Sequence, residues 1–316
     1  ALSVGSARMA KRNVIMRRLP AVEGLGACTL IATDKTGTLT ENTLTATRIR
    51  RPGGEDEITV TGTGHDLDGT FFRGDEPVKP SAQSDLRELL VTGALCNEAM
   101  LVDRDTQSKA RGDTVDIALL VLAAKAGLSR RGLLKAHEPV GQIPFESERR
   151  FAASFHRHGE RVIAHVKGAA ETLADMCDAD RQAINNATTA MAEEGYRVIA
   201  LASGAVDEHA AARGDASALT GLRFLGLVGL IDPVREAVPE ALGKCRSAGI
   251  DVRMVTGDHP ATAQAIARQL QIANDDEPPI TGPEIAASGA EEPELDARIR
   301  GSHVYARVEP LQKVRI

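Results

Sequence analysis

The sequence has no long apolar run and no excess of basic residues. Its two longest apolar runs, Ile117–Ala124 and Phe224–Ile231, are far shorter than the roughly 20 apolar residues that a membrane-spanning helix needs. It contains 38 Lys and Arg against 44 Asp and Glu, for a formal net charge of -6, whereas nucleic-acid-binding domains carry a basic patch. We therefore expect the chain as given to be soluble and to have no nucleic-acid partner.

Cysteines are few, and two common nucleotide-binding loops are missing. The cysteines lie far apart, at Cys28, Cys96, Cys177 and Cys245. Because no two of them form a Cys-x-x-Cys pair, neither a zinc site nor a disulfide framework is indicated, and reduced cysteines are expected. No Gly-x-x-x-x-Gly-Lys-Ser/Thr loop occurs, and no Gly-x-Gly-x-x-Gly opens a helix, which argues against P-loop, kinase and dinucleotide-binding folds.

The sequence does contain a motif suited to phosphate binding, which follows the apolar run Cys28–Ala32. That motif is Asp34-Lys35-Thr36-Gly37-Thr38-Leu39-Thr40. An aspartate at the carboxyl end of a buried strand faces the crevice where open α/β sheets bind ligands, and it can act as a nucleophile. Hydroxyls, close backbone amides and a lysine suit phosphoryl oxygens. The alternative is an aspartate that caps an ordinary turn.

A second segment repeats this arrangement. Val255-Thr256-Gly257-Asp258-His259-Pro260 combines a strand end, a small polar turn and a proline at the first helical position. The Thr256 hydroxyl and the Gly257 backbone NH lie near a predicted helix N-terminus, which favours a transferring phosphoryl group. An ordinary strand-to-helix turn is the alternative reading.

The order of predicted elements indicates a discontinuous α/β domain. The length of 316 residues predicts two domains. Strands at Phe224–Leu230 and Asp251–Val255 alternate with helices at Glu236–Ala248 and Ala261–Leu270, which is a parallel-sheet pattern. The lone strand near residue 30 needs partners, so we expect it to join that later sheet.

The residues between these two parts show a different pattern of predicted secondary structure. Short alternating runs and helical patterns, including a helix capped by Asp113 and stopped by Gly127, predict an inserted α+β domain on an antiparallel sheet. We therefore expect residues 1–20 to be a stalk or linker. Residues 21–45 and 222–316 would form the parallel-sheet domain, and residues 46–221 the insertion, joined by a hinge.

Three short motifs in the predicted insertion could form a nucleotide pocket. They are Phe145 to Arg150, Lys167 to Glu171 and Gly195 to Arg197. An aromatic face can stack on adenine, while Lys167 and Arg197 can meet phosphates or ribose. Taken singly, a core phenylalanine or an exposed arginine would be the better interpretation; their order and spacing together favour the pocket.

These motifs resemble those of the P-type cation-transporting ATPases, in particular the calcium-pump-like branch. The heptapeptide at Asp34 matches the family's phosphorylation signature, and Met254 to Ala267 and Arg307 to Lys313 are similar to its later segments. The resemblance implies a haloacid-dehalogenase-like fold in which Asp34 accepts the ATP γ-phosphoryl group. It also implies catalytic roles for Lys35, Thr36, Thr256, Gly257, Asp258 and Lys313, with Mg²⁺ held by Asp34 and by the Thr36 carbonyl.

The same resemblance assigns the nucleotide contacts. Phe145 corresponds to the adenine-stacking position, Lys167 and Gly168 to the pocket floor, and Arg197 to a residue near the phosphates. Asp116 takes the place of an acidic residue that contacts the adenine amino group. The implied set is completed by Arg150, Asp232, Arg235 and Arg307. Two departures are Ala170, where the family usually has proline, and Thr114 to Asp116, which only loosely follow Pro-Thr-Glu.

The resemblance also sets expectations for the parent protein. Met9 to Glu23 is similar to the family's stalk, and Ile316 precedes the place of its Thr-Gly-Asp-Gly-x-Asn-Asp segment. The family's Thr-Gly-Glu-Ser loop and membrane helices are not found. We expect a piece of a pump, located on the cytoplasmic side of a membrane, that binds ATP but phosphorylates itself poorly. The transported cation is not determined by these motifs.

Two other functions share some of these features. A soluble haloacid-dehalogenase-type phosphatase would use the same nucleophile, but Thr36 stands where its general acid, a second aspartate, is needed. A non-enzymatic nucleotide-binding regulator would bind ATP without any role for Asp34.

Overall fold

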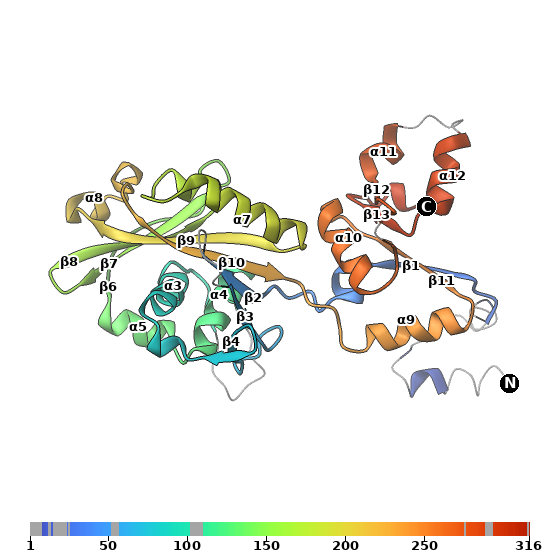
Figure 1. The fold of residues 1–316 in the computed structure, drawn as a ribbon, viewed down its shortest axis with the longest axis horizontal. Helices are drawn as coiled ribbons and strands as arrows, with labels where there is room; N and C mark the ends of the chain where they lie inside the picture. The colour runs from blue at the N-terminus through green and yellow to red at the C-terminus, as the bar shows by residue number, and fades with distance from the viewer. Residues whose placement is uncertain are drawn as a thin grey trace. The chain divides into compact units, whose positions relative to one another are not determined.

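The computed structural model of the protein describes residues 8–11, 14, 24, 26–51, 57–101, 110–274, 276–287, 293–314 and 316. They form two compact units (Figure 1). The discontinuous unit contains Ala1–Leu39 and Arg235–Ile316, and the inserted unit contains Thr40–Val234. The predicted stalk, residues 1–20, lies mostly outside the described residues. None of the helices in the described stretches has the length and apolar character that crossing a lipid bilayer requires.

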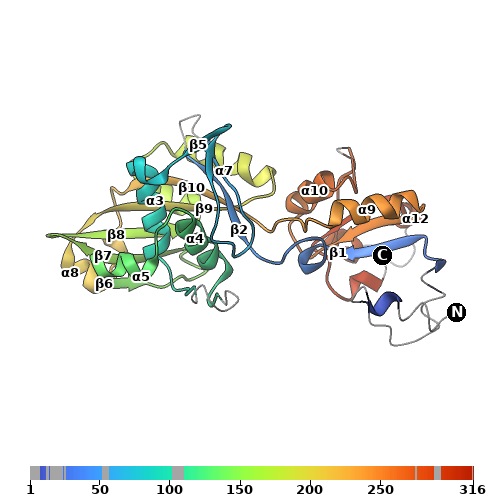
Figure 2. The same cartoon turned by 90° about the horizontal axis from the view of Figure 1, so that it is seen from below.

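The discontinuous unit is built on a parallel sheet, as predicted. Its strand order is β1-β11-β13-β12, and every pairing is parallel. The strands are β1 (Leu30–Asp34), β11 (Asp251–Val255), β12 (Ile280–Thr281) and β13 (Val304–Ala306). The helices are α9 (Val238–Ser247), α10 (Pro260–Gln269), α11 (Gly282–Ala287) and α12 (Pro293–Gly301). Figure 2 shows β1 beside β11, although the two strands come from opposite ends of the chain.

The inserted unit is built on a nine-stranded antiparallel sheet with the order β5-β4-β3-β2-β10-β9-β8-β7-β6. The strands are β2 (Thr45–Arg50), β3 (Glu57–Val60), β4 (Phe71–Arg73), β5 (Glu76–Val78), β6 (Glu138–Ile143), β7 (Phe151–His158), β8 (Arg161–Gly168), β9 (Arg197–Val206) and β10 (Arg223–Ile231). The helices are α3 (Ser84–Leu95), α4 (Thr114–Lys125), α5 (Arg130–Ala136), α6 (Ala170–Ala174), α7 (Arg181–Glu193) and α8 (Glu208–Ala212).

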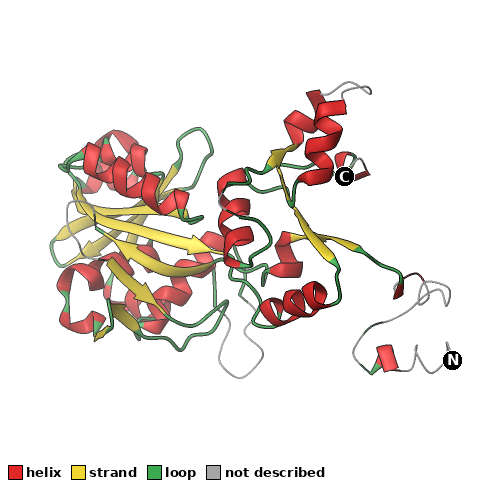
Figure 3. Cartoon of the chain, turned by 45° about the vertical axis from the view of Figure 1, so that its right-hand side comes forward, coloured by secondary structure: helices red, strands yellow, loops and turns green. Residues whose placement is uncertain are grey.

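Helices cover both faces of the antiparallel sheet (Figure 3). On one face, Leu173 of α6 and Ile184 and Met191 of α7 pack with strand residues in one apolar cluster. On the other face, α3 and α4 bury their leucines against β2, β3 and β10 in a second cluster. The Asp113 carboxylate accepts a hydrogen bond from the Val115 NH at 2.8 Å, so it caps α4 as predicted. The result is a three-layer unit with a core on each side of the sheet.

One predicted strand belongs to the other sheet. We expected Phe224–Leu230 to join the parallel sheet, but β10 lies between β2 and β9 and is antiparallel to both. The reason is that helices cover both faces of this sheet, so β10 is buried on both sides and reads as a continuous apolar run. Such a run is equally typical of a central parallel strand. The domain boundaries expected near residues 45 and 221 therefore lie within the inserted unit, Thr40–Val234.

The segment Asp232 to Arg235 precedes helix α9 and is not part of it. Helix α9 begins at Val238, with Pro239 in its first turn. The Asp232 carboxylate instead accepts hydrogen bonds from the Thr40 hydroxyl at 2.5 Å and from the Thr43 NH at 3.2 Å. Asp232 thereby ties together the segments through which the chain enters and leaves the inserted unit.

Packing around β7 predicts a large difference between two phenylalanines. Phe155 is 0 % exposed in the core, whereas Phe145 is 59 % exposed. Phe155→Ala should lower the free energy of unfolding by about 3–5 kcal/mol because it leaves a cavity. Phe145→Ala should lower it by less than about 1 kcal/mol. Urea unfolding followed by circular dichroism measures both, and equal losses would contradict this description of the core.

Candidate active site

Asp34 is the last residue of β1 and lies opposite Val255 of β11, with its side chain partly exposed at the carboxyl edge of the parallel sheet. The chain then turns sharply. Thr36 (φ -74°, ψ 123°) and Gly37 (φ 75°, ψ -5°) have the dihedral angles of a type II turn. This turn needs a positive φ at its third residue, which glycine adopts without steric cost. Arg235 holds the turn by donating from Nη2 to the Gly37 carbonyl oxygen at 3.1 Å.

Two lysines in this unit form ion pairs with two different carboxylates. Lys313 Nζ lies 2.8 Å from Asp34 Oδ2, so these residues, far apart in sequence, meet as predicted. Lys35 is only 4 % exposed and forms an ion pair with Asp258. The cation next to the proposed nucleophile is therefore Lys313, while Lys35 holds the loop that carries Asp258.

The loop after β11 faces the same edge of the sheet. Thr256 is buried, its NH donates to the Tyr305 carbonyl at 2.8 Å, and its hydroxyl accepts from the Asp258 NH at 3.1 Å. Gly257 is exposed between them. Helix α10 starts directly afterwards at Pro260, and the His259 ring caps it by accepting from the Ala261 NH at 3.3 Å. An exposed backbone NH at a helix N-terminus suits an anionic group.

Three residues predicted to contact nucleotide, Asp232, Arg235 and Arg307, do not line the cavity of the inserted unit. Arg235 contacts the Gly37 turn, and Asp232 joins the two connecting segments. Arg307 has a positive φ of 51° and donates its backbone NH to the Asp258 carbonyl at 3.0 Å, so it borders the Thr256 loop. Their proposed contacts with nucleotide stay predictions.

The residues around Asp34 could supply only part of the coordination shell of a magnesium ion. Among the described residues, no three His, Cys, Asp or Glu side chains come together as a metal site. The Asp258 carboxylate is already paired with Lys35. Asp34 and the Thr36 carbonyl therefore offer two oxygen ligands at most. Because Mg²⁺ usually binds one or two carboxylates and takes its other ligands from water and substrate phosphates, this donor set is compatible with it.

The inserted unit contains a cavity of about 350 Å³ between α3, α4, α5 and the strands β6 to β9. Five predicted nucleotide residues line it: Asp116, Phe145, Lys167, Gly168 and Arg197. Arg150 does not line it; its guanidinium lies 2.6 Å from Glu171 in an exposed ion pair. Five of the residues that the sequence suggested for a nucleotide pocket therefore lie in one cavity, and their contacts with nucleotide stay predictions.

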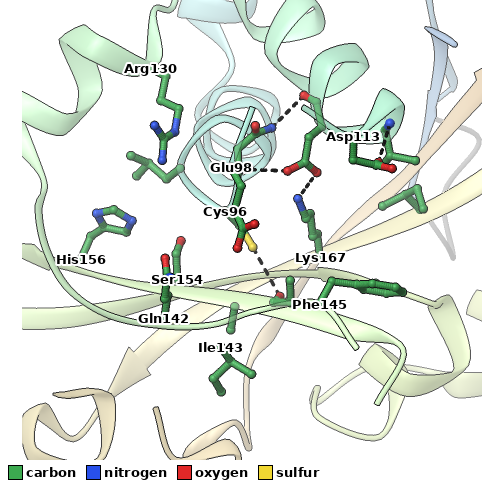
Figure 4. A pocket seen from close by; sticks show the side chains of 18 of the residues that line it. Cys96, Glu98, Asp113, Arg130, Gln142, Ile143, Phe145, Ser154, His156 and Lys167 are labelled. Atoms are coloured by element: carbon green, nitrogen blue, oxygen red, sulfur yellow. Dashed lines mark hydrogen bonds and ion pairs between the residues drawn. The ribbon is translucent and has the colours of Figure 1, made fainter. Parts of the chain in front are cut away.

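A buried ion pair forms the floor of the cavity (Figure 4). Lys167 and Asp116 are 8 % and 6 % exposed and contact each other directly. The other carboxylate oxygen of Asp116 accepts from the Glu98 NH at 2.9 Å, and Asn97 donates to the Asp116 carbonyl at 2.8 Å. These bonds orient Asp116 and neutralise Lys167, while Phe145 presents an exposed aromatic face nearby.

Gly168 allows the backbone of β8 to approach its neighbour. A Cβ atom at this position would lie 2.5 Å from the Arg150 carbonyl oxygen and 2.7 Å from the Cβ of Phe151. Both distances are too short for carbon, so only glycine fits without moving the strand. The close approach holds the floor of the cavity against the chain that carries Phe145.

Sequence reasoning missed several cavity residues, among them Cys96, Asn97, Glu98, Arg130, Ser154 and His156. A partial signal existed, because Ala152, Ser154 and His156 alternate along β7 and so share one face. Cys96 is fully buried, and burial raises the pKa of its thiol to about 11, so it stays protonated and unreactive.

Comparison with known proteins identifies the family. Residues 85–237 match the family described as "P-type ATPase, cytoplasmic domain N". The whole chain is 39% identical over 337 aligned residues to "Cation-transporting ATPase pma1" of Synechocystis, covering 36% of that protein. It is 40% identical to "Probable cation-transporting ATPase F" of Mycobacterium tuberculosis, again covering 36%. It is 33% identical to the rat "Calcium-transporting ATPase type 2C member 2", covering 33%.

The chain belongs to the P-type cation ATPases. It spans about a third of the length of the curated relatives it matches. Within this family the inserted unit is the N domain, and the parallel-sheet unit is the haloacid-dehalogenase-like P domain. The cavity therefore lies in the ATP-binding domain of a P-type ATPase, and Asp34 lies in its phosphorylation domain.

The buried pair in this N domain predicts strong coupling between two substitutions. Lys167→Met should lower the free energy of unfolding by about 3–5 kcal/mol, because it leaves the Asp116 carboxylate buried and unpaired. Adding Asp116→Asn should restore most of the loss. Arg150→Met, which breaks an exposed pair, should cost less than about 1 kcal/mol. Denaturant titration of wild type, Lys167→Met, Asp116→Asn, the double variant and Arg150→Met measures the coupling, and additive losses of the two single variants would contradict it.

Burial of a histidine in the N domain predicts acid sensitivity. Burial, with a smaller effect of His156, lowers the pKa of His165 to about 3 from 6.5. Between these values the unfolded chain binds a proton that the folded chain does not. Stability is therefore fully present above pH 6.5 and falls as pH decreases toward 3, by about 1.4 kcal/mol per pH unit.

Urea unfolding at a series of pH values tests this. His165→Gln should reduce the slope of the free energy of unfolding against pH by that amount in the acid range. Replacement of the exposed His209 should leave the slope unchanged. An unaltered slope in His165→Gln would show that other groups cause the acid sensitivity.

Proposed function

We propose that Asp34 accepts the γ-phosphoryl group of ATP as an aspartyl-phosphate. The observation that carries this proposal is the 2.8 Å contact between Lys313 Nζ and Asp34 Oδ2 at the open edge of the parallel sheet. A carboxylate in this position is accessible, and the ammonium group offsets the charge that develops during transfer.

The proposed reaction is an in-line displacement. An Asp34 carboxylate oxygen forms a bond to the γ-phosphorus while the bond from that phosphorus to the bridging oxygen breaks, and ADP leaves with the bonding electron pair. The Gly257 NH, and the Thr256 hydroxyl after a change of its present bonding, hold the transferred oxygens. Lys35 acts as a positioning residue, because its pair with Asp258 fixes this loop beside β1. Mg²⁺, bound by Asp34, the Thr36 carbonyl and the nucleotide, would supply charge neutralisation.

The cavity of the N domain is proposed to hold the nucleotide. Phe145 offers an exposed face on which adenine can stack, and Arg197 supplies a cation for ribose or phosphate. Asp116 contacts the adenine amino group in this proposal, using a lone pair that its bonds to Lys167 and Glu98 leave available.

For the parent protein we propose ATP-driven cation transport on the cytoplasmic side of a membrane, with this chain as the energy-coupling part. The support is the similarity to relatives whose names include cation-transporting and calcium-transporting ATPases. The 316-residue chain alone should bind ATP but label weakly, because among the described residues Asp34 itself is the carboxylate at this edge that is open to the metal, Asp258 being paired with Lys35.

Phosphorylation by radiolabelled ATP tests the role of Asp34. We expect ATP and Mg²⁺ to give an acid-stable, hydroxylamine-sensitive label, weak in this chain. The label should increase when the corresponding downstream segment of the Mycobacterium tuberculosis relative is appended. Asp34→Asn should abolish it in both proteins, and Lys313→Ala should reduce it at least about tenfold. ATP binding measured by calorimetry should persist in Asp34→Asn and weaken in Phe145→Ala.

Other outcomes distinguish the alternatives. Label that survives Asp34→Asn would refute the proposal. Nucleotide binding without label in the extended protein would favour a binding regulator. Rapid turnover of a small phosphate ester would favour a phosphatase.

A further inference from the structure

Four of the eight histidines of the chain lie together beside the strands β6 to β8 of the N domain. They are His137, directly before β6, His156 and His158 on β7, and His165 on β8. The ring centres of His156 and His165 are 5.6 Å apart, and those of His137 and His158 are 4.9 Å apart. The four rings therefore form two pairs, which we call the inner pair (His156 and His165) and the outer pair (His137 and His158).

The inner pair belongs to the core of the domain. His156 and His165 are 3 % and 4 % exposed. His165 Nδ1 lies 2.9 Å from the Thr92 hydroxyl, and His156 Nδ1 lies 3.2 Å from the His137 carbonyl oxygen. His156 also interacts with the Leu95 backbone. Because both rings are buried and bonded in this way, the inner pair is closed to solutes.

The outer pair lies where the ladder between β6 and β7 ends. Glu138 of β6 is paired with Arg157 of β7, and the strands are antiparallel, so His137 lies opposite His158 in the next position. Glu138 and Arg157 point to the other face of the sheet, because side chains alternate along a strand. The Nδ1 atoms of the outer pair face each other at 3.3 Å. Because His158 is exposed and His137 is half-buried, these two nitrogens lie within reach of solvent.

The spacing of the outer pair matches that of two ligands in a tetrahedral metal site. Imidazole nitrogen is a common ligand of Zn²⁺, at about 2.0–2.1 Å. Two such bonds at the tetrahedral angle of about 109° place the nitrogens about 3.3–3.4 Å apart. Without a metal, a proton on one Nδ1 makes the contact a hydrogen bond. When both rings carry their proton on Nε2 instead, both Nδ1 lone pairs are available to one ion.

The charges around the outer pair permit a cation and limit its type. Burial, with smaller effects of His158 and Arg87, lowers the pKa of His137, so this ring is neutral near pH 7, as a metal ligand must be. Arg87 opposes a cation, but it is exposed, so solvent and salt screen its charge. Within the described stretches no third His, Cys, Asp or Glu joins the pair, so water would complete the coordination shell. Mg²⁺ and Ca²⁺ prefer oxygen ligands, whereas Zn²⁺ and Cu²⁺ accept imidazole nitrogen.

We propose that His137 and His158 bind a divalent transition-metal ion of the Zn²⁺ class through their two Nδ1 atoms. The bound ion joins the start of β6 to the end of β7 and so stabilises this corner of the N domain. Neither histidine lines the cavity, and neither belongs to the unit that contains Asp34. The site is therefore separate from the proposed nucleotide contacts and from the Mg²⁺ proposed at Asp34.

Calorimetric titration of the EDTA-treated 316-residue chain with zinc chloride at neutral pH tests the proposal. We expect saturable Zn²⁺ binding. His137→Asn or His158→Asn should weaken it at least about tenfold, because each removes one of the two protein ligands. His209→Asn changes an exposed histidine outside this group and serves as the matched control, with unchanged binding. Equal concentrations of Mg²⁺ and Ca²⁺ should not compete.

A second substitution of the same shape separates loss of a ligand from general damage. In His158→Asp a carboxylate oxygen stands close to the position of Nδ1, so this variant should keep most of the affinity that His158→Asn loses. Because His158 is exposed, both metal-free variants should unfold on heating like the wild type, as followed by circular dichroism. Added Zn²⁺ should raise the unfolding temperature of the wild type and of His158→Asp, but not that of His158→Asn.

Zinc binding at another histidine is the outcome that these variants must exclude. His303 Nδ1 lies 2.9 Å from Glu277 Oε1, and its Nε2 lies 3.4 Å from Asp251 Oδ1, so this histidine has carboxylates beside it. His303→Asn should leave the binding by the outer pair unchanged. Zn²⁺ binding that both outer-pair variants keep would overturn the proposal, whether or not His303→Asn removes it. Absence of saturable binding to the wild-type chain, or equal competition by Mg²⁺, would overturn it as well.

Discussion

The parallel pairing of β1 with β11 is the constraint on which the rest of the structure depends. A single strand ending at Asp34 cannot form a sheet, and its partner Asp251–Val255 lies far along the chain. Everything between Thr40 and Val234 must therefore leave and return near the same edge, which makes the second unit an insertion. The pairing also brings the two strand ends together, so the Asp34 turn and the Thr256 loop face a common edge.

Two buried lysines and one partly exposed lysine serve different purposes. Lys35 pairs with Asp258, and Lys167 pairs with Asp116, so each buried charge is neutralised by a carboxylate. Lys313 differs because it is partly exposed and contacts the carboxylate of Asp34 at the open edge. Only the exposed pair can be rearranged without a large desolvation cost. This difference separates the residues that hold the sites in shape from those proposed to take part in chemistry.

Sequence patterns predicted the sheet types and the insertion, and they pointed to residues that the structure brings together. Gly37 and the Asp34 heptapeptide specify a local turn, and Phe145, Lys167 and Arg197 do line one cavity. The strand predicted at 224–230 was assigned to the wrong sheet because a doubly buried strand has the same apolar run in either sheet. Arg130 of α5 and Ser154 and His156 of β7 were missed because they come from two elements and belong to no continuous motif.

The sequence by itself determined the chemistry that depends on neighbouring residues: the type II turn after Asp34, the cap of α4 by Asp113 and the helix start at Pro260. These features follow from backbone dihedral preferences and short-range hydrogen bonds. The tertiary structure alone decided which carboxylate each lysine meets and which sheet receives β10. Those outcomes depend on contacts between distant segments, and residue order does not encode which distant segment will be adjacent.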